Sequence, residues 1–351
     1  MPRILVAYDI RAAAVVARHD PAHPMVSRLA ELEALSTDAH DVVRALSALG
    51  HEAALLPIGR DGEAFARIDR ERPDLVLDLC DTLGGRGELA CALPAFCDFL
   101  GVPVAGATGA GKALGRRKHD VKAALCRAGV PTPRYQVIDA EARLESFTLD
   151  LEPPVIVKPT GEHASVGIGP ASVAWDRDAA TARARWLFEH GMGPVLVEEY
   201  VEGVERELLL AGDPPRVFTP IDAPLAVVPA GYPRIRTFDI KWFSDPAFSG
   251  ELPPKDPRFL GPLPVRAPAV PALADDLPTI ARAAFHAAGC RDWGRIDFRV
   301  DAGGIPLVID VTPNAYLSTT SSAADSAAEA GVGYAELLTI ILEGALARRS
   351  A

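Results

Sequence analysis

The chain has 351 residues, which is enough for two or three domains with a substantial core. Its composition is ordinary for a globular protein, with 49% hydrophobic and 24% charged residues. It contains no apolar run of about 18 residues, so no membrane span is expected. The net charge of -11 argues against a general nucleic-acid binder, although a small anion would need only a local positive patch.

The N-terminus and the cysteines favour a cytoplasmic protein. Residues 1–9 predict a strand and lack the apolar h-region and the small-residue cleavage site of a signal peptide. The five cysteines are odd in number and contain no C-x-x-C pair, so we expect reduced thiols and no zinc site.

The first third of the chain predicts strands that alternate with helices. Strands are expected at 3–8, 52–57, 74–79 and 102–105, and helices at 37–49, 61–72 and 88–100. This alternation predicts a parallel sheet with helices on its faces, which we assign to an α/β domain of residues 1–115. The glycine-rich loop 81–87 is either a ligand-binding turn or a plain tight turn. No G-x-G-x-x-G motif supports a dinucleotide site.

Two α+β domains are expected to follow, at residues 116–212 and 213–351. Helices are predicted at 115–128, 177–191, 272–289 and 333–348, and strands at 154–159, 194–201 and 205–211. Residues 213–268 are rich in proline and predict irregular structure.

A hairpin near the C-terminus is the most informative segment. Arg295 and Asp297 fall on one predicted strand, Asp310 ends the next, and the turn Asp301-Ala-Gly-Gly304 joins them. Pairing would bring the two aspartates together with Arg295 on the same face, because side chains repeat every second residue. Two adjacent carboxylates favour a cation such as Mg²⁺, and an arginine beside them suits an anionic intermediate. The alternative is an ordinary surface hairpin with solvated charges.

Two further segments suit a nucleotide. Lys158 ends an apolar strand directly before the small-residue loop 160–169, whose backbone N–H groups could hold phosphates. Glu198 and Glu199 end another apolar strand, where acceptor oxygens could contact adenine and ribose. An exposed acidic strand end is the alternative for these glutamates. The chain keeps only six lysines, at positions 112, 118, 122, 158, 241 and 255, which favours a specific use for some of them.

The order of these features resembles the ATP-grasp superfamily, and most closely its D-alanine–D-alanine ligase branch. The resemblance is carried by Ala128-Gly-Val-Pro-Thr-Pro133, Val157-Lys-Pro159, Ser165-Val-Gly167, Phe238-Asp-Ile-Lys241-Trp242 and Trp293-Gly-Arg-Ile-Asp297. It implies an ATP-grasp fold, in which an N-terminal parallel-sheet domain is followed by two α+β domains that enclose ATP.

The resemblance implies a set of nucleotide-binding residues. They are Lys118, Lys158, Ser165, Glu198, Glu199, Val201, Glu205 and Lys241. Lys118 and Lys158 would hold phosphates beneath the 160–168 loop. Glu198 would accept from the adenine amino group, and Glu205 would bind the ribose.

Metal and catalytic residues are implied in the same way. Mg²⁺, with Mn²⁺ as an alternative, would be held by Asp297, Asp310, Thr312 and Asn314. The catalytic set would be Arg295, Lys241 and Ser165, with Arg295 stabilising the oxyanion and Lys241 touching the γ-phosphate. The implied reaction joins a small-molecule carboxylate to an amine through an acyl phosphate and releases ADP, by positioning and charge neutralisation. Relatives are often homodimers.

The chain departs from this branch where the first substrate binds. A Glu–Ser–Tyr network orients that substrate in D-alanine–D-alanine ligases. Here the serine position is Ala164, the tyrosine position is Trp242, and no Glu and Ser pair follows the first strand. A pocket without these partners loses selectivity, so substrates other than two D-alanines are expected. A genuine D-alanine–D-alanine ligase remains the alternative.

The metal and second-substrate segments also depart from the family pattern. The usual Glu-x-Asn is Asp310-x-Thr312, which leaves open a nucleotide-binding module with weak or no activity. Substrate contacts are expected from Ser318 and Thr319, where a polar capping loop is the alternative. His163 and Trp242 are further substrate candidates, although His163 is favoured as an exposed side chain.

Overall fold

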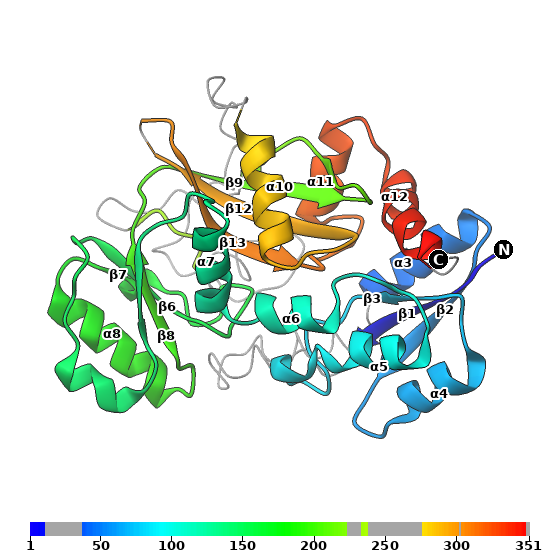
Figure 1. Ribbon diagram of the computed structural model, residues 1–351, viewed down its shortest axis with the longest axis horizontal. Coiled ribbons are helices and arrows are strands. Elements are labelled where there is room, and N and C mark those ends of the chain that lie inside the picture. The colour runs from blue at the N-terminus through cyan, green and yellow to red at the C-terminus, as the bar shows by residue number, and fades with distance from the viewer. Residues whose placement is uncertain (11–36, 223–232, 238–275, 302, 349–351) are drawn as a thin grey trace, which may run out of the picture.

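The computed structural model describes residues 1–10, 37–222, 233–237, 276–301 and 303–348. These residues form three sheets (Figure 1), with the N-terminal sheet at the lower right, the central sheet at the left and the third sheet above and between them. The proline-rich segment predicted to be irregular lies largely outside the described residues, as do Lys241 and Trp242.

The N-terminal sheet is parallel, as predicted, with the strand order β2-β1-β3-β4. Its strands are β1 (Arg3–Asp9), β2 (Glu52–Ile58), β3 (Leu75–Asp78) and β4 (Val104–Ala105). Its helices are α3 (Thr37–Ala48), α4 (Glu63–Glu71), α5 (Ala92–Leu100) and the short η1 (Gly87–Leu89). Alternate β1 residues pack into different core clusters, so both faces of the sheet are covered.

Two short helices connect this sheet to the rest of the chain. They are α6 (Gly109–Gly115), capped by Thr108, and α7 (Lys118–Arg127). The helix predicted at 115–128 corresponds to α7, whereas α6 was not predicted. Gly109 and Gly111 weaken the helical signal of α6, because glycine is a poor helix former.

The central sheet is antiparallel, with the order β5-β8-β6-β7. Its elements are β5 (Tyr135–Ile138), η2 (Glu141–Ser146), β6 (Val155–Pro159), η3 (Pro170–Ser172), β7 (Val173–Ala174), α8 (Arg177–Glu189) and β8 (Val195–Glu199). One face of this sheet packs against α8 through a core that includes Val155, Val157 and Leu187.

The third sheet has the order β10-β9-β12-β13, with β11 also paired to β9. Its elements are β9 (Val204–Ala211), β10 (Arg216–Val217), β11 (Ile221–Asp222), α10 (Leu277–Ala287), β12 (Trp293–Val300), β13 (Pro306–Pro313), α11 (Ser322–Glu329) and α12 (Tyr334–Ala347). The sequence grouped β9 with the central unit, but β9 pairs along its whole length with β12. The sequence did not predict α11.

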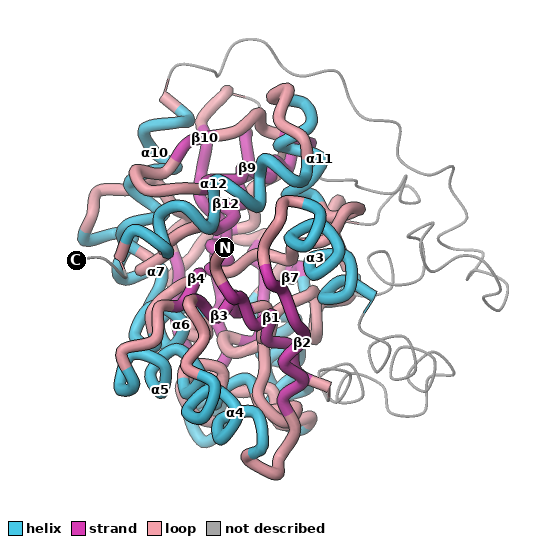
Figure 2. The backbone as a smooth tube through the Cα atoms, turned by 90° about the vertical axis from the view of Figure 1, so that its right-hand side faces the viewer, coloured by secondary structure: helices cyan, strands magenta, loops and turns pink. Residues whose placement is uncertain are grey.

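The two faces of the third sheet connect it to the other parts of the molecule. Leu208, Leu210 and Phe298 pack in one cluster with α7 and α10. Leu209 and Trp293 pack on the opposite face with α11, α12 and residues of the N-terminal sheet. Helix α12 therefore lies against both β4 and β9 (Figure 2).

In the described part of the chain, no single helix is long and apolar enough to cross a membrane. Helices α11 and α12 reach the required length and apolarity only together, and they meet at a bend of 101°.

Candidate active site

The C-terminal hairpin forms as predicted. Strand β12 pairs antiparallel with β13, with Asp297 opposite Asp310 and Arg295 opposite Thr312. Strand β9 adds Glu207 opposite Asp297 on the other side. Directly opposed residues share a face, so three carboxylates form one row across three strands. Glu207 was not predicted from the sequence, although it lies two residues after Glu205 and so shares one face of a strand with it.

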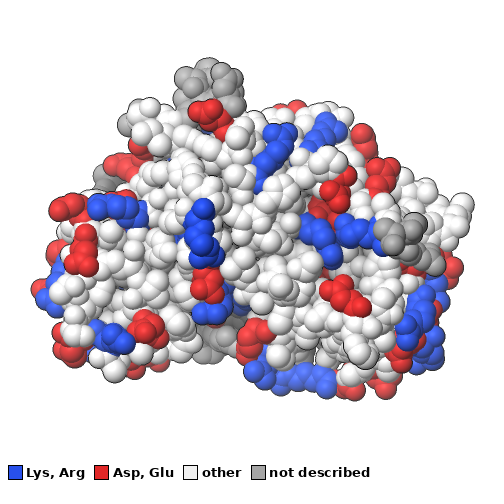
Figure 3. Space-filling view, in the orientation of Figure 1, with Lys and Arg blue, Asp and Glu red and all other residues white. Residues whose placement is uncertain are grey.

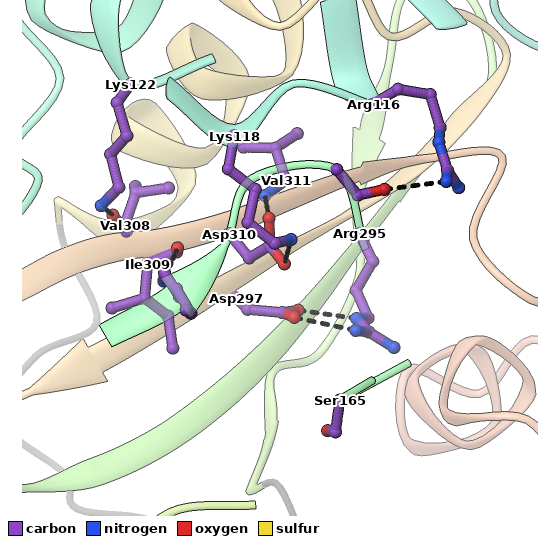
Figure 4. A network of polar contacts seen from close by, with 12 residues as sticks. Arg116, Lys118, Lys122, Ser165, Arg295, Asp297, Val308, Ile309, Asp310 and Val311 are labelled. Carbon is purple, nitrogen blue, oxygen red and sulfur yellow. Dashed lines mark hydrogen bonds and ion pairs between the residues drawn. The ribbon is translucent and has the colours of Figure 1, made fainter. Parts of the chain in front are cut away.

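Each carboxylate of this row has a basic partner, and Figure 4 shows those of Asp297 and Asp310. Arg295 donates from Nε and Nη2 to the two oxygens of Asp297 at 2.6 and 2.8 Å. Lys118 Nζ lies 2.5 Å from Asp310 Oδ2, and Arg236 Nη1 lies 2.7 Å from Glu207 Oε1. The two parallel bonds to Asp297 fix the orientation of the guanidinium group.

The two aspartates have opposite pKa shifts. Burial raises the pKa of Asp297 to about 6, and Arg295 only partly opposes this rise. Burial would also raise the pKa of Asp310, but the charges of Lys118, His163 and Lys158 outweigh it and hold that pKa well below its usual range. Positive charge is therefore concentrated on the Asp310 side of the hairpin.

The donors at this hairpin fit a hard divalent cation. The paired carboxylates of Asp297 and Asp310, with the hydroxyl of Thr312 two residues further along the same face of β13, form an all-oxygen set. Among the described residues, no group of three His, Cys, Asp or Glu side chains is arranged to hold a metal by itself. Mg²⁺ is normally bound by one or two carboxylates together with substrate phosphates, so this set fits Mg²⁺ when a nucleotide completes it.

Asn314, predicted as a fourth metal ligand, is instead used inside the protein. Its Nδ2 donates to Asp78 O at 3.0 Å, and its Oδ1 accepts from Ala107 N at 2.7 Å. The side chain is 6% exposed and its backbone is left-handed, with φ 51°. The amide joins β13 to the N-terminal sheet, so we remove Asn314 from the metal set.

The loop after Lys158 contains residues in the left-handed region of backbone conformation. Ala164 and Ser165 have φ angles of 57° and 62°, which are uncommon for residues other than glycine. Ser165 Oγ donates to Arg236 O at 2.9 Å. Two arginines that the sequence analysis missed hold carbonyls of this loop. Arg116 binds Gly161 O at 2.8 Å, and Arg183 binds Gly167 O at 2.7 Å.

Glu198 lies between two lysines beneath this loop. Its Oε1 is 2.5 Å from Lys158 Nζ, and its Oε2 is 2.9 Å from Lys122 Nζ. Burial would raise the pKa of Glu198, but the two ammonium groups lower it below its ordinary value. Glu198 is therefore a buried, ionised carboxylate rather than an exposed strand end. The sequence analysis did not single out Lys122, although it follows Lys118 by one helical turn.

The other predicted nucleotide contacts lie further along the chain. Glu199 Oε1 accepts from Arg134 Nε at 2.7 Å, so its side chain pairs with an arginine and not with Lys122 or Lys158. Glu205 Oε2 accepts from Arg299 at 2.8 and 3.1 Å, and Val201 O accepts from the same guanidinium group at 3.4 Å. Arg299 thus orders the segment in which adenine and ribose contacts were predicted.

The predicted substrate residues are separated by the structure. His163 is half-buried and lines a small pocket with Thr312 and Arg116, so it is not a simply exposed side chain, and its substrate contact stays a prediction. Ser318 is 1% exposed, and its Oγ accepts from Thr320 N at 3.3 Å. Ser321 caps α11 by accepting from Ala324 N at 3.1 Å, as the capping-loop alternative predicts.

Thr319 is exposed and donates to Asp41 Oδ2 at 3.3 Å. This bond links the loop before α11 to α3 in the N-terminal unit. The predicted role of Thr319 in substrate binding stays a prediction.

Comparison with solved structures defines the fold as ATP-grasp. The D-alanine--D-alanine ligase of Bacillus anthracis complexed with ATP matches with a TM-score of 0.68 and 18% identity, covering 100% of this chain and 99% of that one. Another structure of the Bacillus anthracis ligase matches with a TM-score of 0.69 and 19% identity, over the same shares of both chains.

Sequence relatives then identify the family. The family model described as the D-ala D-ala ligase C-terminus matches residues 262–343. D-alanine--D-alanine ligases of Burkholderia mallei (strain SAVP1) and Burkholderia pseudomallei (strain 668) are each 31% identical over 265 residues, covering 74% of this chain and 75% of theirs. The chain therefore belongs to the D-alanine--D-alanine ligase branch of the ATP-grasp superfamily, a family of ATP-dependent ligases.

Proposed function

We propose that the protein is an ADP-forming ligase that joins a carboxylate to an amine through an acyl phosphate. The proposal is carried by one arrangement: Lys118 and Arg295 lie beside the opposed carboxylates of Asp310 and Asp297 on one face of the third sheet. Such a face combines cations for transferred phosphate with an arginine for a developing oxyanion.

In this proposal Lys118 and Lys158 bind and orient the phosphates. Lys118 and Lys158 would exchange their carboxylate partners, Asp310 and Glu198, for phosphate oxygens. Asp297, Asp310 and Thr312 would hold Mg²⁺, which supplies charge neutralisation on the phosphates when bound. Arg295, oriented by Asp297, would stabilise the charge on the tetrahedral oxygen as the amine attacks.

We further propose that the substrates are not two D-alanines. Ala164 has no hydroxyl at the position where the family places a serine, and Trp242 has none where the family places a tyrosine. A pocket that no longer hydrogen-bonds a substrate group discriminates poorly in favour of that group. The second candidate, D-alanyl-D-alanine formation, is favoured by the names of the relatives that are 31% identical over 74% of the chain.

The test is an ADP-release assay with Mg²⁺ and ATP over a matrix of D- and L-amino acids and small carboxylates, with products identified by mass. If ADP is released with another pair of substrates but not with D-alanine, the substrate proposal is supported. If ADP is released with D-alanine alone and the product is its dipeptide, the second candidate is supported. The variant Ala164→Ser restores one hydroxyl and is expected to raise turnover of D-alanine. If no pair of substrates releases ADP but ATP binding is measurable, the protein would be a nucleotide-binding module without ligase activity.

The homodimer expected from the family is also carried forward as a proposal. Sedimentation equilibrium of the full chain distinguishes a dimer of about twice 37.2 kDa from a monomer.

A further inference from the structure

Lys122 is a buried lysine that the proposed reaction does not use. It is 2% exposed. Its Nζ lies 2.9 Å from Glu198 Oε2, 2.6 Å from Thr132 Oγ1 and 3.2 Å from Val308 O. Its ammonium group therefore has two hydrogen-bond acceptors, Thr132 Oγ1 and Val308 O, in addition to its carboxylate partner Glu198. Figure 4 shows its side chain directed at Val308, apart from the Lys118–Asp310 pair.

Lys158 also pairs with Glu198, but its ammonium group has fewer close hydrogen-bond acceptors than that of Lys122. Its Nζ lies 2.5 Å from Glu198 Oε1, and its other contact, to Ile309 O, is long at 3.4 Å. It is also more exposed than Lys122, at 8% against 2%. Of the two lysines on Glu198, Lys158 is the one with an incomplete set of acceptors and access to the phosphate loop.

The cluster carries an excess of positive charge. In the part of the chain that the structure describes, Lys118, Lys122 and Lys158 form ion pairs with Glu198 and Asp310, which gives these five side chains one net positive charge. If Lys122 were absent, the cluster would be neutral. Lys158 could then bind a phosphate only by leaving Glu198, 2% exposed, as a buried carboxylate without a counter-ion. That state is strongly unfavourable.

We propose that Lys122 is a positioning residue for nucleotide binding. It stays on Glu198 as a permanent counter-ion, and this allows Lys158 to move its ammonium group from Glu198 to a nucleotide phosphate. The inference rests on the proposed function, because it requires that ATP bind at this site. It predicts that ATP affinity follows the net charge of the cluster.

The main variant is Lys122→Met, and Lys112→Met is its matched control. Lys112 is also buried, at 6% exposure, and its Nζ lies 2.5 Å from Asp78 and 2.6 Å from Cys80 O in the N-terminal unit. Both variants remove one buried ammonium group from a carboxylate, so a general loss of stability affects both. Lys112 lines the same small pocket as His163, but only the first variant changes the charge of the group formed by Lys118, Lys122, Lys158, Glu198 and Asp310.

Isothermal titration of the full chain with ATP and with adenosine separates charge from shape. Loss of one unit charge at roughly 8 Å with an effective dielectric constant of about 20 corresponds to about 30-fold in affinity. We expect Lys122→Met to weaken the binding of ATP by this factor. The affinity for adenosine should fall by less than about threefold, because adenosine has no phosphate. Lys112→Met is expected to leave both affinities within about threefold of the wild type.

The double variant Lys122→Met, Glu198→Gln provides the decisive comparison. It restores one net positive charge and leaves no unpaired carboxylate, and glutamine keeps one side-chain oxygen as an acceptor for adenine, so ATP affinity is expected to rise well above that of Lys122→Met. Lys122→Arg, which keeps the charge, is expected to bind ATP similarly. If Lys122→Met does not fold, the double variant carries the test.

Several outcomes would overturn the inference. One is equal ATP affinity for Lys122→Met and the wild type, and another is an equal loss for ATP and adenosine. A double variant that stays about 30-fold weaker than the wild type would also overturn it. A wild-type protein that binds no ATP would instead contradict the proposed function itself, so the two failures are distinguishable.

Discussion

Replacing Asn314 by alanine is expected to destabilise the fold strongly without acting on a metal. The substitution removes the acceptor of Ala107 N–H at 2.7 Å and the donor to Asp78 C=O at 3.0 Å, both in a buried environment. A buried backbone group that loses its partner costs about 1–3 kcal/mol. Holding alanine at a φ of 51° adds about 1–2 kcal/mol. With two such groups, the expected loss is roughly 3–8 kcal/mol, a large part of a typical folding free energy.

Urea denaturation measures this loss as a lower midpoint with an unchanged slope. The Mg²⁺ concentration needed for half-maximal ADP formation is measured on the same preparations. Asn314→Asp keeps an acceptor but loses the donor, so it is expected to be less stable with no gain in Mg²⁺ affinity. Thr312→Val is the matched control, expected to raise the Mg²⁺ requirement while changing stability by less than about 0.5 kcal/mol.

The opposite pattern would refute the structural role of Asn314. If Asn314→Ala kept the wild-type midpoint but needed much more Mg²⁺, or if Asn314→Asp tightened Mg²⁺ binding, the amide would be a metal ligand. A carboxylate in place of an amide strengthens a true Mg²⁺ site.

Three further predictions concern other parts of the site. Arg295→Lys keeps a charge but loses the paired bonds to Asp297, and kcat for ADP formation should fall about 10²–10³-fold with little change in melting temperature. Gly106→Ala should lower the melting temperature, because its Cβ would lie 2.5 Å from Asn314 Nδ2 and φ is +127°; an unchanged value would contradict this. Glu198, whose pKa is lowered on folding, contributes stability above its unfolded pKa of about 4.5 and loses it as the pH falls through the folded value. Stability of Glu198→Gln should therefore depend less on pH below 4.5, as acid titration followed by circular dichroism would test.

Local patterns in the sequence were sufficient for much of the fold. The parallel N-terminal sheet followed from strands that alternate with helices, since such strands can pair in parallel only through a crossover. The opposition of Asp297 and Asp310 followed from a short turn, which fixes the register of the two strands it joins. These features depend on residues that are close in the chain.

The tertiary structure decided what depends on distant residues. Strand β9 joins β12 across about 90 positions of sequence, and this pairing places Glu207 in the carboxylate row. The partners of Glu198 come from α7 and β6, and the partners of Asn314 come from two segments of the N-terminal unit. Periodicity and spacing identify which face a side chain occupies, but not which distant group it meets there. The sequence by itself therefore determined the candidate chemistry of the hairpin, whereas packing of separate segments decided that Asn314 bonds to the N-terminal unit and that Lys122 contacts Glu198.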